Sequence, residues 1–496
     1  MGVMRFVVLP ADALRDWPEV HRAYLGGADQ SVWPTRVELD GNLMICRRQN
    51  SDSGRLYVAW PVPEFGRPVL CSASLPEREQ PYLLVVELAR GKIVQIRNQL
   101  AAWQGAGMAI PRDFTEFHHQ AHQLFAAAAA AQDSPEHASL LAQDALVQAC
   151  KAAESLTVSY TRQRLESRHR QYPNLPTALG CGLGHASPPQ GDAERSFAQA
   201  FNAAAIPLEW RTIEAHEGDY QWEACDAQVA WCLKHELLLR CGPLLDLSPD
   251  GLPAWLKTWE NDYWNLESFV CDFVETAITR YVGKVRIWEI SARPNTGGAL
   301  SLTEEQRLTL TAKTLDVARR ADPEGQFLVR IDQPWGEYQA KGQHKLSPLH
   351  FIDALHRSGV GLSGVNLEVA VGYGAGGGSR DLIEVSRMID QWSALGLPLQ
   401  VTLVFPSQAG PDLHAADSIA LDRSSWKMPW SEPAQAEWGE LYLRLMMAKP
   451  AVVALFWSHF SDHVAHRFAH GGLLRPDGTP KPALQRIIKI RKAYWK

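Results

Sequence analysis

The sequence predicts an α/β protein with a (β/α)8 TIM barrel, preceded by a small β-sandwich-like domain and a helical connector. Three observations predict this order. Short strand patterns split by turn residues fill residues 1–110, helical patterns fill residues 111–175, and strands alternate with helices over residues 176–496. Such alternation is typical of βαβ units and a parallel sheet. The length also suffices, since a TIM barrel takes roughly 250 residues.

The first region contains short apolar runs of strand length. Asp40-Gly41 and Arg90-Gly91 each fall between two such runs and predict hairpin turns. We expect the strands to form a small antiparallel sandwich. Such domains often bind carbohydrate, but a packing appendage is an equal alternative, because fold alone does not give function. The predicted strands are 5–9, 36–39, 43–47, 56–60, 82–88 and 92–97.

The second region is helical in pattern. An alanine run at residues 126–131 lies inside a predicted helix over 117–132, and Ser134 followed by Pro135 predicts the start of the next helix. Apolar residues at helical spacing continue over 139–168. We expect these helices to connect the sandwich to the barrel.

The third region holds eight strand candidates, the number that closes a TIM barrel. Chemistry in such barrels is carried by the loops that follow the carboxyl ends of the strands. Polar residues at those ends are therefore the site candidates. The predicted strands are 178–183, 207–210, 236–240, 285–291, 326–331, 364–371, 398–405 and 452–457, and the helices between them include 264–281, 304–321, 380–395 and 434–448.

Composition and charge narrow the classes of partner. A net charge of −6 and a pI near 6.3 give no footprint for nucleic acid or an anionic membrane. No stretch approaches the roughly 18 apolar residues that span a bilayer. The apolar run before Asp12 is too short for a signal peptide, so we expect a cytoplasmic protein, or a secreted one if a leader was removed. The eight cysteines show no CxxC pairing. The sequence predicts no cofactor. It does not predict an oligomeric state.

An ordered series of motifs runs through the barrel region. Arg280-Tyr-Val-Gly-Lys-Val-Arg-Ile-Trp288 is followed by segments such as Gly396-Leu-Pro-Leu-Gln-Val-Thr402 and Leu473-Leu-Arg-Pro-Asp-Gly-Thr-Pro-Lys-Pro482, and preceded by Leu252-Pro-Ala-Trp-Leu256. Over roughly residues 176–490 the series resembles glycoside hydrolase family 10, the xylanase family. The resemblance implies a retaining (β/α)8 glycosidase fold and a carbohydrate ligand or substrate.

The resemblance also implies where the catalytic glutamates of that family would lie, and other residues stand there. Family members carry the acid/base glutamate in W-D-V-V-N-E, where this chain has Trp288-Glu-Ile-Ser-Ala-Arg293, and Leu403 stands in the place of the nucleophile. A retaining glycosidase needs two carboxyl groups. Arginine cannot deliver a proton near neutral pH because its pKa stays above about 12. Any hydrolysis must therefore use other carboxylates.

Several carboxylates remain near the predicted strand ends. Asp332 and Glu368 lie nearest those ends and are the better candidates for an acid and base pair. Glu289 would lie deeper and neutralise a cation in the core. Each carboxylate could instead form a structural ion pair with Arg211, Arg293 or Arg330. The catalytic candidates are Asp332, Glu368, Glu209 and Asp246.

A second group of residues is predicted to bind the sugar. Trp457 matches the strand-8 tryptophan of the family, so the resemblance implies sugar stacking there. Arg293 suits the carboxylate or sulfate of an acidic sugar, through a bidentate pair. Trp335 and Tyr338 lie on a loop expected at the open face. The predicted binding residues are Trp457, Arg293, Trp335, Tyr338, His459 and His463.

Four histidines follow the last predicted strand at spacings of four, three and four: His459, His463, His466 and His470. On a helix these rings would share one face, and imidazole is a common metal ligand. No HExxH motif is present, and Asp462 is the acid nearest to them. Sugar-contacting or solvated loop histidines are therefore favoured over a metal site.

Three functions remain open. The first is a divergent glycoside hydrolase that acts on a poly- or oligosaccharide with relocated carboxylates. The second is a non-catalytic barrel that binds glycan. The third, less favoured, is a metal-dependent hydrolase built on the histidines.

Overall fold

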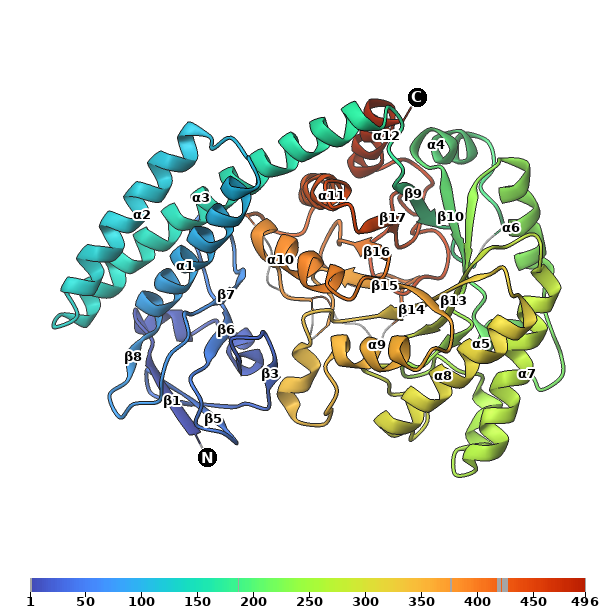
Figure 1. Cartoon of the computed structure of the whole chain (residues 1–496), viewed down its shortest axis with the longest axis horizontal. Coiled ribbons are helices and arrows are strands. Elements are labelled where there is room, and N and C mark those ends of the chain that lie inside the picture. The colour runs from blue at the N-terminus through green and yellow to red at the C-terminus, as the bar shows by residue number, and fades with distance from the viewer. Residues whose placement is uncertain (1, 186, 375–376, 417–420, 422–426, 496) are drawn as a thin grey trace.

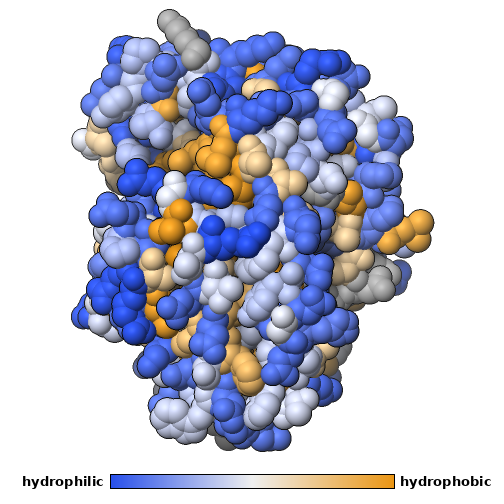
Figure 2. Space-filling model, turned by 90° about the vertical axis from the view of Figure 1, so that its right-hand side faces the viewer, coloured by the Kyte–Doolittle hydropathy of each residue, from blue (hydrophilic) through white to orange (hydrophobic). Residues whose placement is uncertain are grey.

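The computed structural model describes the whole chain except residues 1, 186, 375–376, 417–420, 422–426 and 496. The N-terminal strands and three long helices lie on one side of the molecule, and the barrel lies on the other (Figure 1). Polar residues cover most of the face shown in Figure 2, with smaller apolar groups between them. Within the described ranges, every helix is too short or too polar to cross a membrane.

The first 83 residues form two small sheets of four strands each, with orders β4-β5-β1-β8 and β3-β2-β6-β7. The predicted hairpin at Asp40-Gly41 is confirmed: Asp40 pairs with Leu43, and Gly41 takes a φ of 59°, which a tight turn needs. The strands are β1 (Gly2–Val7), β2 (Tyr24–Gly26), β3 (Val32–Trp33), β4 (Arg36–Asp40), β5 (Leu43–Arg48), β6 (Arg55–Ala59), β7 (Val69–Cys71) and β8 (Tyr82–Leu83).

The strands predicted at 82–88 and 92–97, and the turn at Arg90-Gly91, are wrong. After the short β8, residues 84–105 form one helix, α1 (Leu84–Gly105). Gly91 lies mid-helix because α1 packs against β7, where a Cβ on Gly91 would lie 1.9 Å from the Cys71 carbonyl oxygen. The glycine therefore marks a close approach of two backbones and not a turn.

Two further helices, α2 (Arg112–Ala130) and α3 (Pro135–Gln171), pack with α1 into a helical layer. The start of a helix after Ser134 is confirmed. The far part of α3 reaches the barrel and packs on two of its helices, α10 (Leu382–Ser393) and α11 (Glu432–Met447) (Figure 1). Ile383 of α10 belongs to the same buried cluster as Ile93, Trp103 and Leu156 of the helical layer.

The predicted TIM barrel is confirmed. Among the described residues, eight parallel strands form a ring that closes where β17 pairs with β9 and β11 pairs with β13, and the short β12 extends the β11 side of β13. The strands are β9 (Ala178–Gly182), β10 (Ala203–Ile206), β11 (Leu238–Cys241), β12 (Leu245–Asp246), β13 (Ile287–Ala292), β14 (Gln326–Ile331), β15 (Leu362–Ala370), β16 (Leu399–Val404) and β17 (Val452–Trp457).

Helices cover the outside of this ring. They are α4 (Asp192–Ala200), α6 (Glu223–Lys234), α7 (Tyr263–Tyr281), α8 (Glu304–Ala321), α9 (Pro348–Arg357), α10, α11 and α12 (Pro482–Tyr494), with a short α5 (Trp210–Ile213) after β10. The helix predicted at 304–321 coincides with α8, whose Thr303 and Gln306 form a capping box.

The strand predicted at 207–210 is wrong. The second barrel strand is β10, residues 203–206, and it ends before Pro207. Three consecutive alanines give little strand signal, yet they fit here because the barrel interior is crowded at this strand. Pro207 has no N–H to continue the ladder, so the chain leaves the sheet, and Glu209 becomes the residue that precedes α5.

The N-terminal sheets contact loops at the mouth of the barrel. The Thr35 amide donates to the Ala340 carbonyl at 2.9 Å, and the Val69 amide donates to the Ser379 carbonyl at 2.8 Å. Buried Arg380 pairs with Glu337 at 2.6 Å and donates to the Tyr24 hydroxyl at 3.2 Å. These loops follow β14 and β15, so the N-terminal domain braces one side of the barrel mouth.

Candidate functional site

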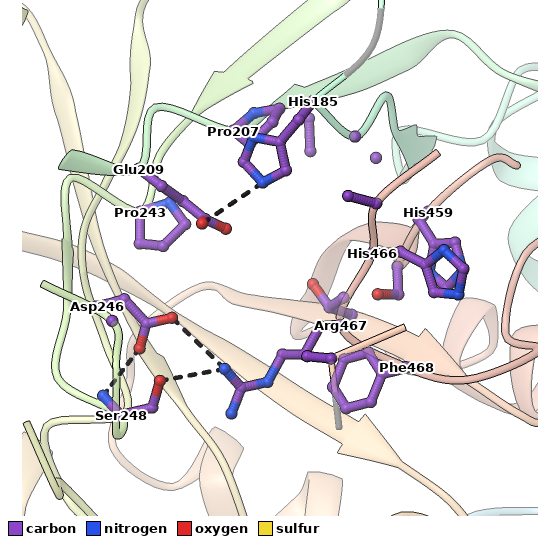
Figure 3. Close-up of a pocket in the computed structure, with 18 of the residues that line it drawn as sticks. His185, Pro207, Glu209, Pro243, Asp246, Ser248, His459, His466, Arg467 and Phe468 are labelled. Carbon is purple, nitrogen blue, oxygen red and sulfur yellow. Dashed lines mark hydrogen bonds and ion pairs between the residues drawn. The ribbon is translucent and has the colours of Figure 1, made fainter. Parts of the chain in front are cut away.

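A cavity of about 710 Å³ opens at the carboxyl ends of the barrel strands, the place where the fold class carries chemistry. A smaller cavity of about 170 Å³ lies beside it, lined by Asp332, Glu368 and Trp335. Arg467 and Phe468, from the loop after β17, line both cavities and therefore separate them. Figure 3 shows Arg467 reaching from that loop toward Asp246 and Ser248.

Arg293 follows β13 and lies at the centre of the mouth, 2% exposed. Its Nη1 donates to Asp246 at 2.8 Å, its Nε donates to Glu368 at 3.1 Å, and its Nη2 also binds Glu368. The backbone of Arg293 has a φ of 57°, an unusual conformation for a residue with a side chain. The turn there directs the guanidinium between the two carboxylates.

A second set of charges lies below Arg293, inside the barrel. Fully buried Glu289 pairs with Arg330 and accepts from the Asn366 amide at 2.5 Å, while Arg240 lies 3.9 Å away. Arg330 also donates to Glu368 at 3.3 Å. The two layers therefore form one continuous network of buried ion pairs, in which most carboxylates and guanidinium groups satisfy each other.

The charges around the mouth shift the pKa values of its carboxyl groups in different directions. Burial by itself would raise the pKa of Glu368, but Arg293 and Arg330 outweigh it and hold that pKa below its usual value. Asp246 is held well below its usual pKa in the same way, by Arg293 and Arg467 against burial. Burial and the charge of Glu368 raise the pKa of Asp332 to about 6, against the opposing effect of Arg293.

Asp332 follows β14 and is held differently from the other acids. The side-chain Oδ1 of Asp332 accepts a hydrogen bond from the Thr296 hydroxyl at 2.8 Å. The backbone carbonyl of Asp332 accepts one from the side-chain amide of Asn295 at 2.9 Å. Within the described part of the chain, Asp332 has no ion pair with a basic side chain, whereas Asp246 and Glu368 both do. Asp332 is therefore the carboxyl group of this mouth that is most easily protonated.

Glu209 lies on the opposite rim of the larger cavity. Its Oε2 is 3.4 Å from His185 Nε2 (Figure 3). The same oxygen is 3.0 Å from Arg211 Nε. Burial would raise its pKa, but His185 and Arg211 lower that pKa to about 2. Glu209 is consequently a stable anion and not a proton donor near neutral pH.

The aromatic residues predicted to bind sugar separate into two groups. Trp335 lines the smaller cavity, with the Arg380 guanidinium 4.7 Å from its ring centre. Trp457 is 1% exposed, its indole N–H donates to the Gly471 carbonyl at 2.7 Å, and its ring packs toward Gly439. Tyr338 is also buried, and its hydroxyl donates to the Leu346 carbonyl at 2.9 Å. Trp457 and Tyr338 thus line neither cavity.

The four histidines do not share a helix face, because the segment after β17 consists of turns and loops. His459 and His466 line the larger cavity and stack at 4.5 Å between ring centres. His463 lines a separate cavity of about 310 Å³ and contacts the Pro476 carbonyl at 2.8 Å. His470 lies against Asp412.

His459, Asp462 and His466 place possible ligand atoms within 4.8 Å of one another. Their lone pairs are largely committed elsewhere. Lys481 binds Asp462 Oδ2 at 2.5 Å, and the Gly472 amide donates to Oδ1 at 2.7 Å. Both ring nitrogens of His466 face oxygen acceptors, Val464 carbonyl and Asp412 carboxylate. The ammonium of Lys481 thus already neutralises Asp462, the carboxylate that a metal ion would need in this group.

Sequence reasoning missed Arg467, Phe468 and His185 as lining residues. Arg467 and Phe468 lie within the histidine-rich segment that the pattern had singled out, so that segment was a usable signal. His185 follows β9 directly, a position that the strand-end rule would have selected.

The structure thus defines a closed parallel (β/α)8 barrel whose mouth holds buried carboxylates and arginines. Comparison with known proteins confirms the resemblance found in the motifs: the model described as "Glycosyl hydrolase family 10" matches residues 193–404. A curated relative, "Endo-1,4-beta-xylanase B" of Thermotoga neapolitana, is 22% identical over 204 residues, which cover 39% of this chain. The match spans about half, 55%, of that relative.

Solved structures agree on the fold. A family 10 protein of Paenibacillus barcinonensis is 16% identical with a TM-score of 0.50, covering 67% of this chain and 97% of its own. Native xylanase 10B of Thermotoga maritima is 17% identical with a TM-score of 0.49, covering 66% and 99%. At 16% identity, the likeness to the Paenibacillus barcinonensis structure speaks for the barrel fold alone.

Proposed function

We propose that this chain is a divergent glycoside hydrolase that acts on a poly- or oligosaccharide, with Asp332 as proton donor and Glu368 as its ionised partner. One observation carries the proposal. Asp332 follows β14, Glu368 lies near the end of the neighbouring β15, both line the same cavity, and their surroundings shift their pKa values in opposite directions. Paired carboxyl groups with separated pKa values are the usual arrangement for acid and base roles.

In this mechanism the protonated Asp332 transfers its proton to the glycosidic oxygen as the bond from that oxygen to the anomeric carbon breaks. Glu368 stays ionised because Arg293 and Arg330 hold its charge, and its anionic field stabilises the positive charge that develops on the sugar ring. Water then supplies hydroxide to the anomeric carbon, and its remaining proton returns to Asp332. Trp335, in the same cavity, offers a face for the sugar ring.

Support from relatives is consistent with this class. The matching family model is that of a glycosyl hydrolase family, and the curated relative is named as an endo-1,4-beta-xylanase. We propose a carbohydrate substrate on this ground.

Asp332→Asn tests the proposal. The substitution keeps the acceptor for Thr296 but removes the proton, so we expect reducing-sugar release from a panel of oligosaccharides to fall at least a hundredfold, since general acid catalysis supplies about 10²–10⁴. Glycan affinity, measured by calorimetry, should change little. Glu116→Gln, an exposed acid of α2, serves as control.

A second function is favoured by one observation: Arg293 engages both Asp246 and Glu368, as in a structural ion pair. A glycan-binding barrel without turnover would give affinity for the panel and no reducing-sugar release in either the parent protein or the variant. If the parent protein neither binds nor cleaves any glycan, both functions are wrong.

A further inference from the structure

Arg467 presents an unused hydrogen-bonding edge where the two cavities meet. Its Nη1 donates to the Ser248 hydroxyl at 3.1 Å and lies 3.7 Å from Asp246 (Figure 3). Its buried Nε has no partner among the described residues, and its Nη2 makes no hydrogen bond to them. The side chain is 33% exposed although its Nε is buried, so a ligand in the cavity can reach the guanidinium at Nη2.

The contrast with Arg293 identifies which arginine is available. On Arg293 the edge formed by Nε and Nη2 holds Glu368, and Nη1 holds Asp246. Arg293 was the residue predicted to bind an acidic sugar, but its donors are already directed at protein carboxylates. On Arg467 the Nη2 makes no hydrogen bond to a described residue, so it remains available as a charge-assisted donor to a carboxylate.

The surroundings of Arg467 favour an anion. Ser248 and Asp246 hold Nη1 and so fix the plane of the guanidinium before a ligand arrives, which reduces the cost of binding. Among the described residues that line the larger cavity, arginines outnumber acids: Arg211, Arg240, Arg293, Arg330 and Arg467 against Glu209, Asp246 and Asp250. Burial and the charge of Arg293 also lower the pKa of Arg467, an unfavourable effect that a bound anion would offset.

We infer that the larger cavity accepts a sugar that carries a carboxylate, a uronic acid unit, and that Arg467 binds this carboxylate through Nη2. The inference rests on the proposed function only in placing an oligosaccharide at the barrel mouth, where Arg467 borders both the smaller cavity of Asp332 and Glu368 and the larger cavity. It does not require that the sugar be cleaved. Arg467 is a specificity-determining residue in this account, and Asp332 remains the proton donor.

The test uses an oligosaccharide with one uronic acid unit and the same oligosaccharide after reduction of its carboxyl group to an alcohol. Calorimetry with the full-length protein should show the acidic form bound about tenfold or more tightly, the value of a hydrogen bond to a charged group. Arg467→Gln should abolish this preference. Arg467→Lys, which keeps the charge without the fork, should retain only part of it. Arg112→Gln, an exposed arginine of α2, should keep all of it.

Equal affinity for the two sugars in the parent protein, or a preference that persists in Arg467→Gln, would overturn the inference. Unchanged affinity of Arg467→Gln for the reduced sugar shows that the variant is folded at the site. Hydrolysis is measured in parallel. Cleavage without a preference for the acidic sugar would support the proposed function and contradict the inference. A preference without cleavage would support the inference and contradict the proposed function. If neither sugar binds, both are wrong.

Discussion

Arg293 combines an unusual backbone conformation with three buried charge-assisted contacts. A positive φ on a residue with a side chain costs about 1–3 kcal/mol. Loss of one member of a buried ion pair costs more, about 3–5 kcal/mol, because an uncompensated charge remains. The contacts with Asp246 and Glu368 therefore outweigh the backbone cost and keep the loop after β13 in place.

Asp332 should make stability depend on pH near 6. Its folded pKa of about 6 lies above the ordinary value of 3.8, so its contribution to stability is complete below about pH 4 and is lost as pH rises through 6. Asp332→Asn lacks this titration. We expect the unfolding free energy of the variant minus that of the parent protein to increase by up to about 3 kcal/mol between pH 4 and pH 8. Urea unfolding across this range measures the difference, and a constant difference would contradict the assigned protonation.

At the scale of single residues, most of the correct predictions came from one rule, that functional residues of a (β/α)8 barrel lie at the carboxyl ends of its strands. Asp246, Asp332 and Glu368 all lie at the barrel mouth as that rule requires. The orientation of side chains was beyond its reach. Trp457 points into the core because Gly439 leaves room for its ring and the Gly471 carbonyl takes its N–H, and neither contact is visible in sequence spacing.

Among the elements, long apolar patterns bounded by turn residues were predictable. The strands at 326–331 and 452–457 coincide with β14 and β17. Errors arose where tertiary packing overrides local preference. The alanines of β10 carry little strand preference but suit a crowded barrel, and Gly91 resembles a turn residue but allows α1 to meet β7.

Gly91→Ala should therefore destabilise the protein, although alanine is the better helix former by about 1 kcal/mol. The new methyl group would lie 1.9 Å from the Cys71 carbonyl and 2.5 Å from Ser72 backbone, so α1 and β7 would have to separate. Gly105→Ala is the matched control in the same helix, because nothing lies within 4 Å of its Cβ position. Thermal unfolding should show a lower midpoint for the first variant and an equal or higher one for the second. A higher midpoint for Gly91→Ala would contradict the close packing.

For the whole molecule, the N-terminal region and the barrel share buried contacts. Lys92 of α1 forms a buried ion pair with Asp381 before α10, and Arg380 binds both Glu337 and Tyr24. The helical layer also covers Ile383 of α10. The division at residues 110 and 175 stays a prediction from the strand and helix patterns, and we propose that these links make the parts depend on one another for stability.

Deletion of residues 1–171 should accordingly leave a barrel that aggregates or unfolds at a clearly lower temperature. The deletion exposes the apolar side of α10 and α11 and leaves Asp381 without Lys92. Sedimentation and thermal unfolding of residues 172–496 measure the effect, and co-expression of residues 1–171 should restore soluble protein. A soluble fragment with an unchanged unfolding temperature would show instead that the barrel folds alone.

The pairing of Arg293 with two acids also limits how this sequence can evolve. A glutamate at position 293 would bring a third carboxylate against Asp246 and Glu368 with fewer cations to balance them. A single exchange of Arg293 for an acid should therefore destabilise the site, and a tolerated change would have to alter positions 246, 293 and 368 together. Among descendants of this gene, those three positions should covary as a unit.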